Sequence, residues 1–452
     1  MTTSVSEYVK LSTPVPLASR VPWYKSTFPT YIGIFLWVGF YLELAGPTIG
    51  KAHISVCLWG LLVAGLLCFA LYYYVPAMLG MQTGHPLYVV GSSAFGMTGG
   101  YLIPGLLMGM LQVGWVAVIA GVAADFIMKG LGQTSHGLFS VIVVVWVYSL
   151  GWIAIKGIHH VGRVAKFLNW IPLIMMLIVF WANRDGIAQY HVRHDDPWIG
   201  FVNVITIVIG YFATAGAAGA DFGMNNRNQK DIVKGGIFGI VVGVLLAGGL
   251  PILSVAGYLG RNAGPETYSY TAAIASVGAL APLMFFLFAA ASLVPTCFSS
   301  FIAANSFSTM LPKIPRTVST VVAITISATL AITGVASNLV GFFGIVGASF
   351  SPICGAMAAE YIETGRRWSG PREGINWAGY IAWTIGFLVG IPDHIYGLPA
   401  AWISADNPAV LYSFAVGFIV YVLLAKLGLR SAVVDPNGRM LWPAAKGASA
   451  GE

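Results

Sequence analysis

Charged side chains are scarce in this sequence. Only 9% of the 452 residues are Asp, Glu, Lys or Arg, whereas 57% are hydrophobic and the mean hydropathy is +0.80. A soluble domain usually carries about 25% charged residues, so this chain has too few to cover a surface that faces water. The deficit excludes an ordinary soluble protein and predicts an integral membrane protein.

Cysteine is also rare, and its spacing carries no chemistry. The four cysteines all fall in apolar segments, without the spacing of a metal site or a disulfide framework, and we interpret them as small buried apolar residues: Cys57, Cys68, Cys297 and Cys354. No mid-membrane nucleophile–base pair is present, so we expect neither an enzyme nor a cofactor. The net charge of +7 comes from basic residues scattered over loops, which argues against a nucleic-acid partner.

Twelve apolar segments are long enough to cross a bilayer, which requires about 20 mainly apolar residues. They predict an all-α polytopic protein and cover residues 28–50, 55–78, 100–128, 137–155, 165–182, 199–221, 235–260, 272–304, 316–334, 337–362, 375–394 and 409–428. The eighth is the least regular because Pro295 lies inside it. The first ~25 residues lack an apolar signal-peptide core, so residues 1–27 and 429–452 are expected to be tails.

The basic residues predict the topology. If the N-terminus is cytoplasmic, 18 of the 23 Lys and Arg residues fall on the cytoplasmic side, and the opposite side receives only Lys51, Lys129, Arg184, Arg193 and Arg261. This bias is typical of cytoplasmic loops. It predicts that both tails are cytoplasmic and that the number of spans is even. The membrane is expected to be the plasma membrane, which in a bacterium is the inner membrane.

Two spans are interrupted by glycine at corresponding positions. The first contains Gly39 and Gly46-Pro47, and the sixth contains the small-residue stretch Gly210–Gly219. Paired broken helices in two halves indicate a transporter site at the middle of the membrane. Because five spans separate the two interruptions, the halves must be inverted. This predicts repeats over residues 28–182 and 199–362, with two further spans over 375–428.

Several polar side chains within spans are candidates for the site. Gln112 and Trp115 are three residues apart, so both point to one helix face, and together they suit a planar, hydrogen-bonding ligand. A packed tryptophan with a helix-bridging glutamine explains them equally well. Ser292, Thr296 and Cys297 flank Pro295. They either ligate a cation or substrate, or bond back to their own helix.

Glu43 is the acidic residue predicted to lie well inside an apolar span. A carboxylate inside the membrane is costly and is a functional hypothesis by default. Three roles remain open for it: a proton-coupling group, a counter-ion for a cationic substrate or Na⁺, and a structural partner of a buried donor.

The sequence resembles the nucleobase:cation symporter-1 family, and within it the cytosine permease branch. The similar stretches run in register over about Val21 to Gly390, and it is their order and spacing that identify the family. They are Met81–Pro86 with Ser93–Gly96, Gln112–Trp115, Thr214–Phe222 with Asn226–Asn228, Gly341–Pro352 with Glu360-Tyr361, and Asn376–Gly379.

This resemblance implies the leucine-transporter-type fold, with 5+5 inverted repeats and discontinuous helices one and six. It implies import of a purine, pyrimidine, hydantoin or related heterocycle driven by Na⁺ or H⁺. It further implies that Trp115 stacks on the ligand ring, that Gln112 hydrogen-bonds near it, that Phe212 flanks the other face, and that Thr214 and the helix-six backbone around Gly216 supply polar contacts.

The sequence departs from the family in two places. Where cytosine permease-like members have a Thr-Thr-Asn-Asp type run in helix eight, this chain has Pro295-Thr296-Cys297-Phe298. The amide that would hold cytosine is missing, and only Thr296, with Ser292 one turn earlier, is left to hold Na⁺. Glu43 stands where a neutral residue is expected. These departures point to altered coupling or to a substrate with positive charge or extra donors.

We therefore expect a secondary active importer of a nucleobase-like or related planar nitrogen heterocycle, coupled to H⁺ or Na⁺ and working by alternating access. The coupling ion is expected beside Gly39, Phe40, Glu43, Ser292 and Thr296. The alternatives are a transporter of a cationic amine or amino-acid-type substrate with Glu43 as counter-ion, and a receptor or channel that does not concentrate its ligand. The expected partners are the small-molecule substrate and membrane lipid.

Overall fold

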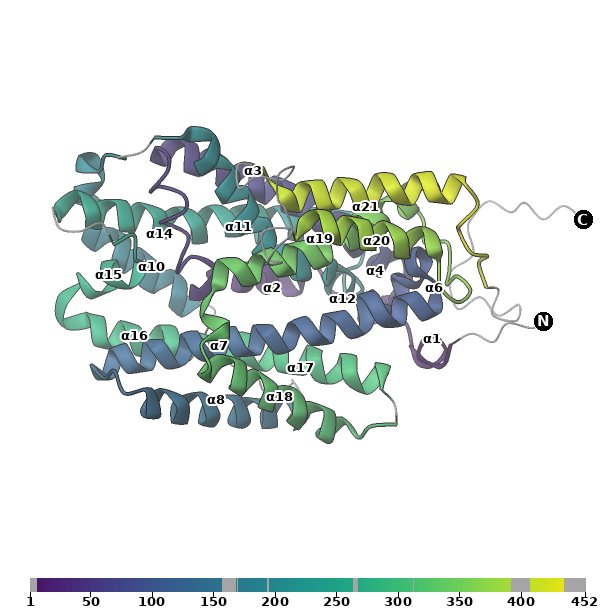
Figure 1. Cartoon of the computed structure of the whole chain (residues 1–452), viewed down its shortest axis with the longest axis horizontal. Helices are drawn as coiled ribbons and strands as arrows, with labels where there is room; N and C mark the ends of the chain where they lie inside the picture. Colours follow the sequence, from purple (N-terminus) through teal and green to yellow (C-terminus); the bar gives the residue numbers. More distant parts are fainter. Residues whose placement is uncertain are drawn as a thin grey trace, which may run out of the picture.

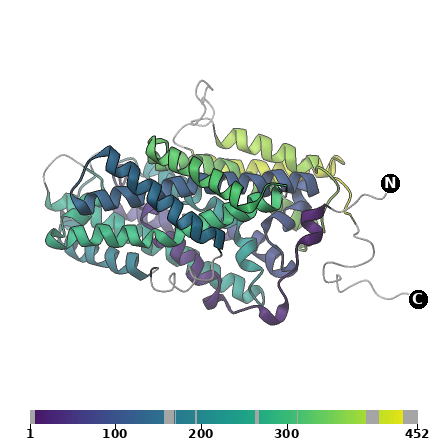
Figure 2. The same ribbon diagram turned by 90° about the horizontal axis from the view of Figure 1, so that it is seen from below.

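The computed structural model describes residues 6–156, 168, 170–192, 195–262, 267–311, 313–391 and 407–434. These residues form α-helices joined by short 3-10 and π segments. The helices lie along one long axis (Figures 1 and 2). The short helix α1 (Glu7–Leu11) and the end of α21 (Ala409–Lys426) lie at the same end of the molecule. An even number of crossings places them there.

The first half of the chain supplies five crossings. Their helices are α2 (Thr27–Leu36), α3 (Ile54–Leu67) continued by a π segment and α4 (Tyr74–Thr83), α6 (Ser92–Gly100) continued by a π segment and α7 (Met108–Leu131), α8 (His136–Lys156) and α10 (Trp170–Asn183). The short α5 (Leu87–Val90) lies between α4 and α6. The fifth predicted span begins at residue 165, and its part up to 167 lies outside the described residues.

The second half supplies five more crossings and is followed by two others. The helices are α11 (Pro197–Ala217) with α12 (Gly219–Gly223), α13 (Gln229–Gly236) with α14 (Val242–Arg261), α15 (Tyr270–Ala275) with α16 (Ala281–Ala291) and α17 (Leu293–Met310), α18 (Arg316–Ile332), α19 (Leu339–Glu363), α20 (Trp377–Gly390) and α21. Within the described ranges, nine helices are long and apolar enough to cross a membrane, and three are shorter apolar helices. Together they coincide with the twelve predicted spans, and the chain is an integral, multi-pass membrane protein.

Two boundaries differ from those expected. The third crossing starts at Ser92 rather than near residue 100, and its π segment Tyr101–Leu107 contains Pro104. A wider turn accommodates a residue that has no N–H to donate. The eighth crossing breaks at Ser292 rather than at Pro295. Pro295 lies in the first turn of α17, where backbone N–H groups have no partner within the helix anyway.

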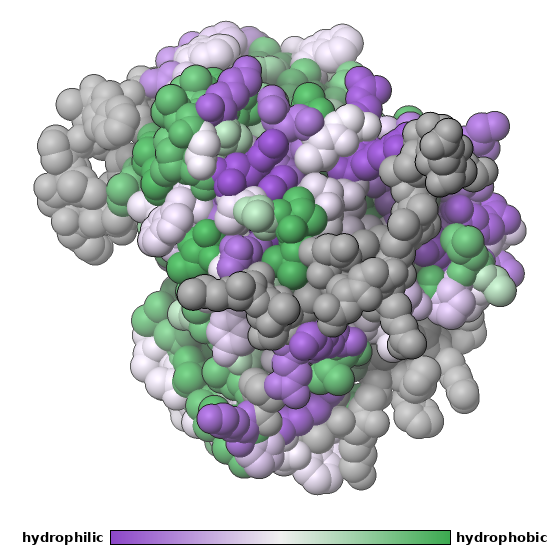
Figure 3. Space-filling model, turned by 90° about the vertical axis from the view of Figure 1, so that its right-hand side faces the viewer, coloured by the Kyte–Doolittle hydropathy of each residue, from purple (hydrophilic) through white to green (hydrophobic). Residues whose placement is uncertain are grey.

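The helices pack in two groups, one around α7 and one around α11. α7 packs against α8, α16, α17 and α18, whereas α11 packs against α3 and α19 (Figure 1). Hydrophilic side chains gather at the end of the molecule that carries α1, with hydrophobic surface between them (Figure 3). A site between α7 and α11 is therefore enclosed by both groups.

The first crossing loses helical geometry earlier than Gly46-Pro47 predicts. α2 ends at Leu36, and Trp37 has extended torsions (φ −69°, ψ 131°) before a 3-10 turn over Val38–Phe40. Irregular turns then continue to Lys51. In the sixth crossing, α11 stays helical through Gly210–Gly216 and the interruption falls at Ala218, the penultimate residue of the small-residue stretch.

Candidate substrate site

Trp115 is the centre of a buried aromatic cluster between α7 and α11. Its side chain is 7% exposed, and its indole Nε1–H donates a hydrogen bond to Thr214 Oγ1 on α11 over 3.2 Å. Tyr211, three residues before Thr214 and therefore on the same face of α11, places its ring edge-on to Trp115 with centroids 5.4 Å apart. Two helices from different halves of the chain thus share one aromatic and polar cluster.

Two phenylalanines of α19 close another side of Trp115. The ring of Phe342 lies edge-on to it at 5.0 Å between centroids, and the ring of Phe343 is tilted at 5.7 Å. A Cβ atom at residue 114 would come within 2.6 Å of the Phe342 ring. Gly114 in the sequence Gln112–Trp115 therefore permits α19 to approach α7 closely.

The interruption of helix one brings Trp37 to the same cluster. Trp37 is 3% exposed, and its indole Nε1–H donates to Ser292 Oγ over 2.9 Å. Its ring is edge-on to Trp115 at 6.3 Å and nearly parallel to Tyr211 at 6.4 Å. A side chain at Gly39 would overlap the Trp37 indole, so glycine at this position lets the ring fold back across the backbone.

Gln112 shares the buried side of α7 with Trp115, as its spacing predicts. It is 6% exposed, and its Nε2–H donates to Met108 Sδ over 3.5 Å. Thioether sulfur is a weak acceptor. This amide therefore retains capacity to bind a ligand beside Trp115.

Phe212 and Gly216 face a different direction from Tyr211 and Thr214. The Phe212 ring stacks on Phe35 of α2 at 5.4 Å and 13°, and a Cβ at Gly216 would come within 2.7 Å of Tyr72. Both residues thus pack helix six against the crossings of α2 and α3. Phe40 is closer to the cluster, because its ring centroid lies 4.8 Å from that of Tyr211.

The polar residues of the eighth crossing bond back to their own helix, which was one of the two expectations for them. Ser292 Oγ donates to Phe288 O, and Thr296 Oγ1 donates to Ser292 O over 2.7 Å. Each hydroxyl oxygen also accepts an indole N–H, from Trp37 and from Trp146 respectively. Ser292 therefore borders the cluster, whereas Thr296 faces α8.

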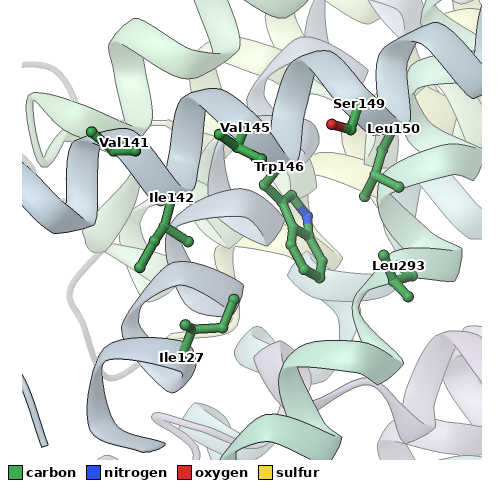
Figure 4. A pocket seen from close by; sticks show the side chains of 8 residues that line it. All are labelled: Ile127, Val141, Ile142, Val145, Trp146, Ser149, Leu150 and Leu293. Carbon is green, nitrogen blue, oxygen red and sulfur yellow. The ribbon is translucent and has the colours of Figure 1, made fainter. Parts of the chain in front are cut away.

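Cys297 also lies on the α8 side of the eighth crossing. It packs in a small cluster with Leu150, Trp146 and Leu293. Beside this cluster, an apolar hollow opens between α7, α8 and α17 (Figure 4), lined by Ile127, Val141, Ile142, Val145, Trp146, Ser149, Leu150 and Leu293. Val141 and Val145 are largely exposed, so the hollow opens outward rather than toward Trp115.

Glu43 is separate from the cluster. Its side chain is exposed, and the charged groups that act on its carboxylate are Lys129 and Asp125. These two residues form an i, i+4 ion pair in the last two turns of α7. The structure thus places Glu43 near the C-terminal end of α7, whereas Trp115 lies nearer its N-terminal end.

The sequence reasoning missed Trp37 and Tyr211. A usable signal existed for Tyr211, because its i, i+3 spacing with Thr214 is the relation that paired Gln112 with Trp115. No comparable signal exists for Trp37, since an isolated tryptophan in an apolar span is usually a packing residue.

The chain was compared with known protein families, curated proteins and solved structures. No family model matches the chain. The cytosine permeases of two Escherichia coli strains, K12 and O6:H1 (CFT073), are each 22% identical to it over 404 residues, covering 83% of this chain and 87% of the permease. Among solved structures, Mhp1, a nucleobase-cation-symport-1 family transporter in a closed conformation with bromovinylhydantoin bound, superposes with a TM-score of 0.71 at 16% identity. That match covers 92% of this chain and 94% of Mhp1.

These findings confirm the resemblance to the nucleobase:cation symporter-1 family. The inward-facing conformation of Mhp1 gives a TM-score of 0.68 at 15% identity, covering 93% of this chain and 95% of Mhp1. A Na⁺-coupled sialic acid symporter gives 0.61 at 12% identity, covering 96% of this chain and 94% of the symporter. The fold is therefore the leucine-transporter-type 5+5 inverted repeat expected of a nucleobase:cation symporter-1 relative.

Proposed function

We propose that the chain is a secondary active importer of an uncharged, nucleobase-like planar nitrogen heterocycle, coupled to H⁺ or Na⁺ and working by alternating access. The observation that carries this proposal is the buried cluster of Trp115, Tyr211 and Thr214 between α7 and α11. Aromatic rings bind planar ligands by stacking, and the hydroxyl and amide groups around them supply donors and acceptors. The relation to cytosine permease and to a hydantoin-binding transporter supports the same ligand class.

The polarity of the cluster favours a neutral ligand over a cationic amine. The polar side chains at its edge are Gln112, Thr214 and Ser292, all uncharged. Glu43, the counter-ion that an amine substrate would need, is exposed beside Lys129 instead. A cation buried without a counter-charge costs several kcal/mol, so this site suits an uncharged ring.

The coupling ion is part of the same proposal and is H⁺ or Na⁺. Ser292 and Thr296 remain the side chains proposed to hold Na⁺, with Gly39 and Phe40 at the break of helix one contributing backbone. Both hydroxyls already accept an indole N–H. A bound Na⁺ would therefore have to share or replace these donors, a rearrangement that H⁺ coupling does not require.

Uptake into proteoliposomes tests the proposal. The purified protein would be reconstituted and offered radiolabelled uracil, hydantoin and agmatine under an imposed Na⁺ gradient, an imposed pH gradient and neither. We expect concentrative uptake of at least one heterocycle with one of the two gradients. Preferential uptake of agmatine would favour the amine transporter, and binding without accumulation under any gradient would favour a receptor or channel.

A further inference from the structure

The candidate site is closed by its own side chains. Trp37, Trp115 and Tyr211 pack against one another with centroids 5.4 to 6.4 Å apart, and they are 3%, 7% and 4% exposed. A heterocycle stacks only on a ring face that it can reach. A side chain therefore has to move before a planar ligand can enter between Trp37, Trp115 and Tyr211.

Trp115 and Tyr211 are the fixed members. Both stand inside regular helices, α7 and α11, and each is tied across the cluster, Trp115 to Thr214 Oγ1 and Tyr211 Oη–H to the carbonyl of Ile34. Moving either ring would break an interhelical hydrogen bond at a residue held in a regular helix. Trp37 also donates a hydrogen bond, to Ser292, but it stands outside regular helix.

Trp37 is the movable member. It is the single extended residue between α2 and the 3-10 turn Val38–Phe40. Its indole lies across the bare backbone of Gly39 rather than against another side chain there. Rotation at such a break needs no loss of helical hydrogen bonds, and hinges of this kind commonly absorb the torsional change in a conformational step.

The Trp37 indole also has the chemistry expected of the substrate. It is a planar, uncharged nitrogen heterocycle whose one N–H donates to Ser292 Oγ over 2.9 Å. Ser292 lies at the junction between α16 and α17, and its hydroxyl donates a second hydrogen bond to Phe288 O. A ligand with a ring N–H could take over this bond, so that no buried acceptor is left unpaired.

We propose that Trp37 is a resident competitor: its indole occupies the substrate position in this state, and a heterocycle binds by displacing it and donating a ring N–H to Ser292. The inference rests on the proposed function and narrows its substrate class to planar rings that carry an N–H donor at the edge. A fully N-methylated ring could still stack but could not replace the bond to Ser292.

Binding to purified wild-type and Trp37→Ala protein tests this proposal. The probes are radiolabelled uracil and hydantoin, unlabelled N-methylated hydantoin, and free indole, with Trp59→Ala as the control because Trp59 is a largely exposed tryptophan of α3. If the displaced state is populated at about one tenth, removing the competitor tightens apparent binding roughly tenfold. Free indole should compete in Trp37→Ala but not in the wild type, and the N-methylated ring should compete poorly in both.

Weaker heterocycle binding by Trp37→Ala would overturn the proposal, because it would mean that Trp37 contacts the bound ligand instead of competing with it. Equal competition by the N-methylated ring would also overturn it. If Trp37→Ala does not fold, Trp37→Leu keeps much of the apolar volume and carries the same expectation. Absence of heterocycle uptake by the wild type would instead contradict the proposed function. In that case, a rise in the unfolding temperature of Trp37→Ala on addition of indole would still show that a ring binds at the position left by the Trp37 side chain.

Discussion

Helix one and helix six cross the same region of the membrane, and they contribute to the site in different ways. Helix six is regular through Tyr211 and Thr214 and is interrupted only at Ala218. Helix one ends at Leu36 and continues through irregular turns to Lys51. Regular helix fixes side-chain directions, whereas a broken segment permits its side chains and backbone to move. Two helices at corresponding positions of an inverted repeat can therefore contribute to one site in different ways, one by fixed side chains and the other by a movable segment.

Substitutions in these two helices should therefore differ in how strongly they change substrate affinity. Substitutions along the contact of α7 and helix six should change affinity strongly, because these side chains are fixed in the cluster. Substitutions in the irregular turns of helix one between Phe40 and Lys51 should change the affinity little.

Trp115→Ala should have the largest effect. It removes the ring that helix six anchors through Thr214, and base–aromatic stacking contributes on the order of 1–3 kcal/mol in nucleic-acid sites. We expect heterocycle affinity to fall roughly ten- to a hundredfold in equilibrium binding of radiolabelled ligand. Trp59→Ala, at an exposed tryptophan, is the matched control, and equal affinity for both variants would show that Trp115 only packs.

The same substitution in both helices tests their difference directly. Thr214→Val leaves the Trp115 indole N–H without its acceptor, whereas the Thr48 hydroxyl, in the irregular part of helix one, donates to carbonyls of its own segment, Leu44 and Ala45. A buried donor left unpaired costs about 1–3 kcal/mol. Heterocycle binding should weaken roughly tenfold in Thr214→Val and hardly change in Thr48→Val. Thr214→Ser should restore it, and equal losses at both positions would remove the distinction.

Beyond its interruption, helix six carries an acid without a basic partner. Among the described acids that are not exposed, Asp231, Glu360 and Asp125 each form an ion pair. Asp221 in α12 instead accepts the backbone N–H of Leu87, over 3.3 Å.

This arrangement gives a stability prediction with a defined sign. A carboxylate inside a span without a basic partner is costly, so Asp221→Asn, which keeps an acceptor for the Leu87 N–H, should not lower the stability of the fold. Thermal unfolding of the purified wild type and variant would show it, and a lower unfolding temperature for the variant would mean that the Asp221 carboxylate stabilises the protein.

Glu43→Gln should have the smallest effect on substrate affinity. The carboxylate is exposed beside Lys129 and Asp125, so heterocycle affinity should stay within about twofold of the wild type, well under the ~1.4 kcal/mol of a tenfold change. A tenfold loss in the same binding assay would return Glu43 to the substrate site. Ion-gradient dependence of uptake by this variant tests its proposed coupling role separately.

The sequence predicted the fold well because hydropathy and charge act over whole spans. Twelve apolar segments and the bias of basic residues indicate an even number of crossings without any knowledge of packing. Single interruptions are harder to locate. Gly46-Pro47 marked helix one, yet the helix ends at Leu36, because Trp37 turns to bury its indole against Gly39 and Ser292.

Helical spacing predicted part of the candidate site. Gln112 and Trp115 follow from an i, i+3 relation on a regular helix, whereas Thr214 was implied by the family resemblance. The resemblance implied Phe212, whose ring instead stacks on Phe35. One residue rotates a side chain by about 100° around a helix, which is why the neighbouring Tyr211 faces Trp115. The position of Glu43 depends on how an irregular segment turns, which periodicity does not describe.

An experimental structure of the protein with a bound heterocycle would show whether the Trp115 cluster is the substrate site. We expect ligand density stacked on the Trp115 indole between α7 and α11, within hydrogen-bonding reach of Gln112 or Ser292. Density beside Glu43, or in the hollow lined by Trp146 on α8, with the Trp115 cluster closed, would contradict it.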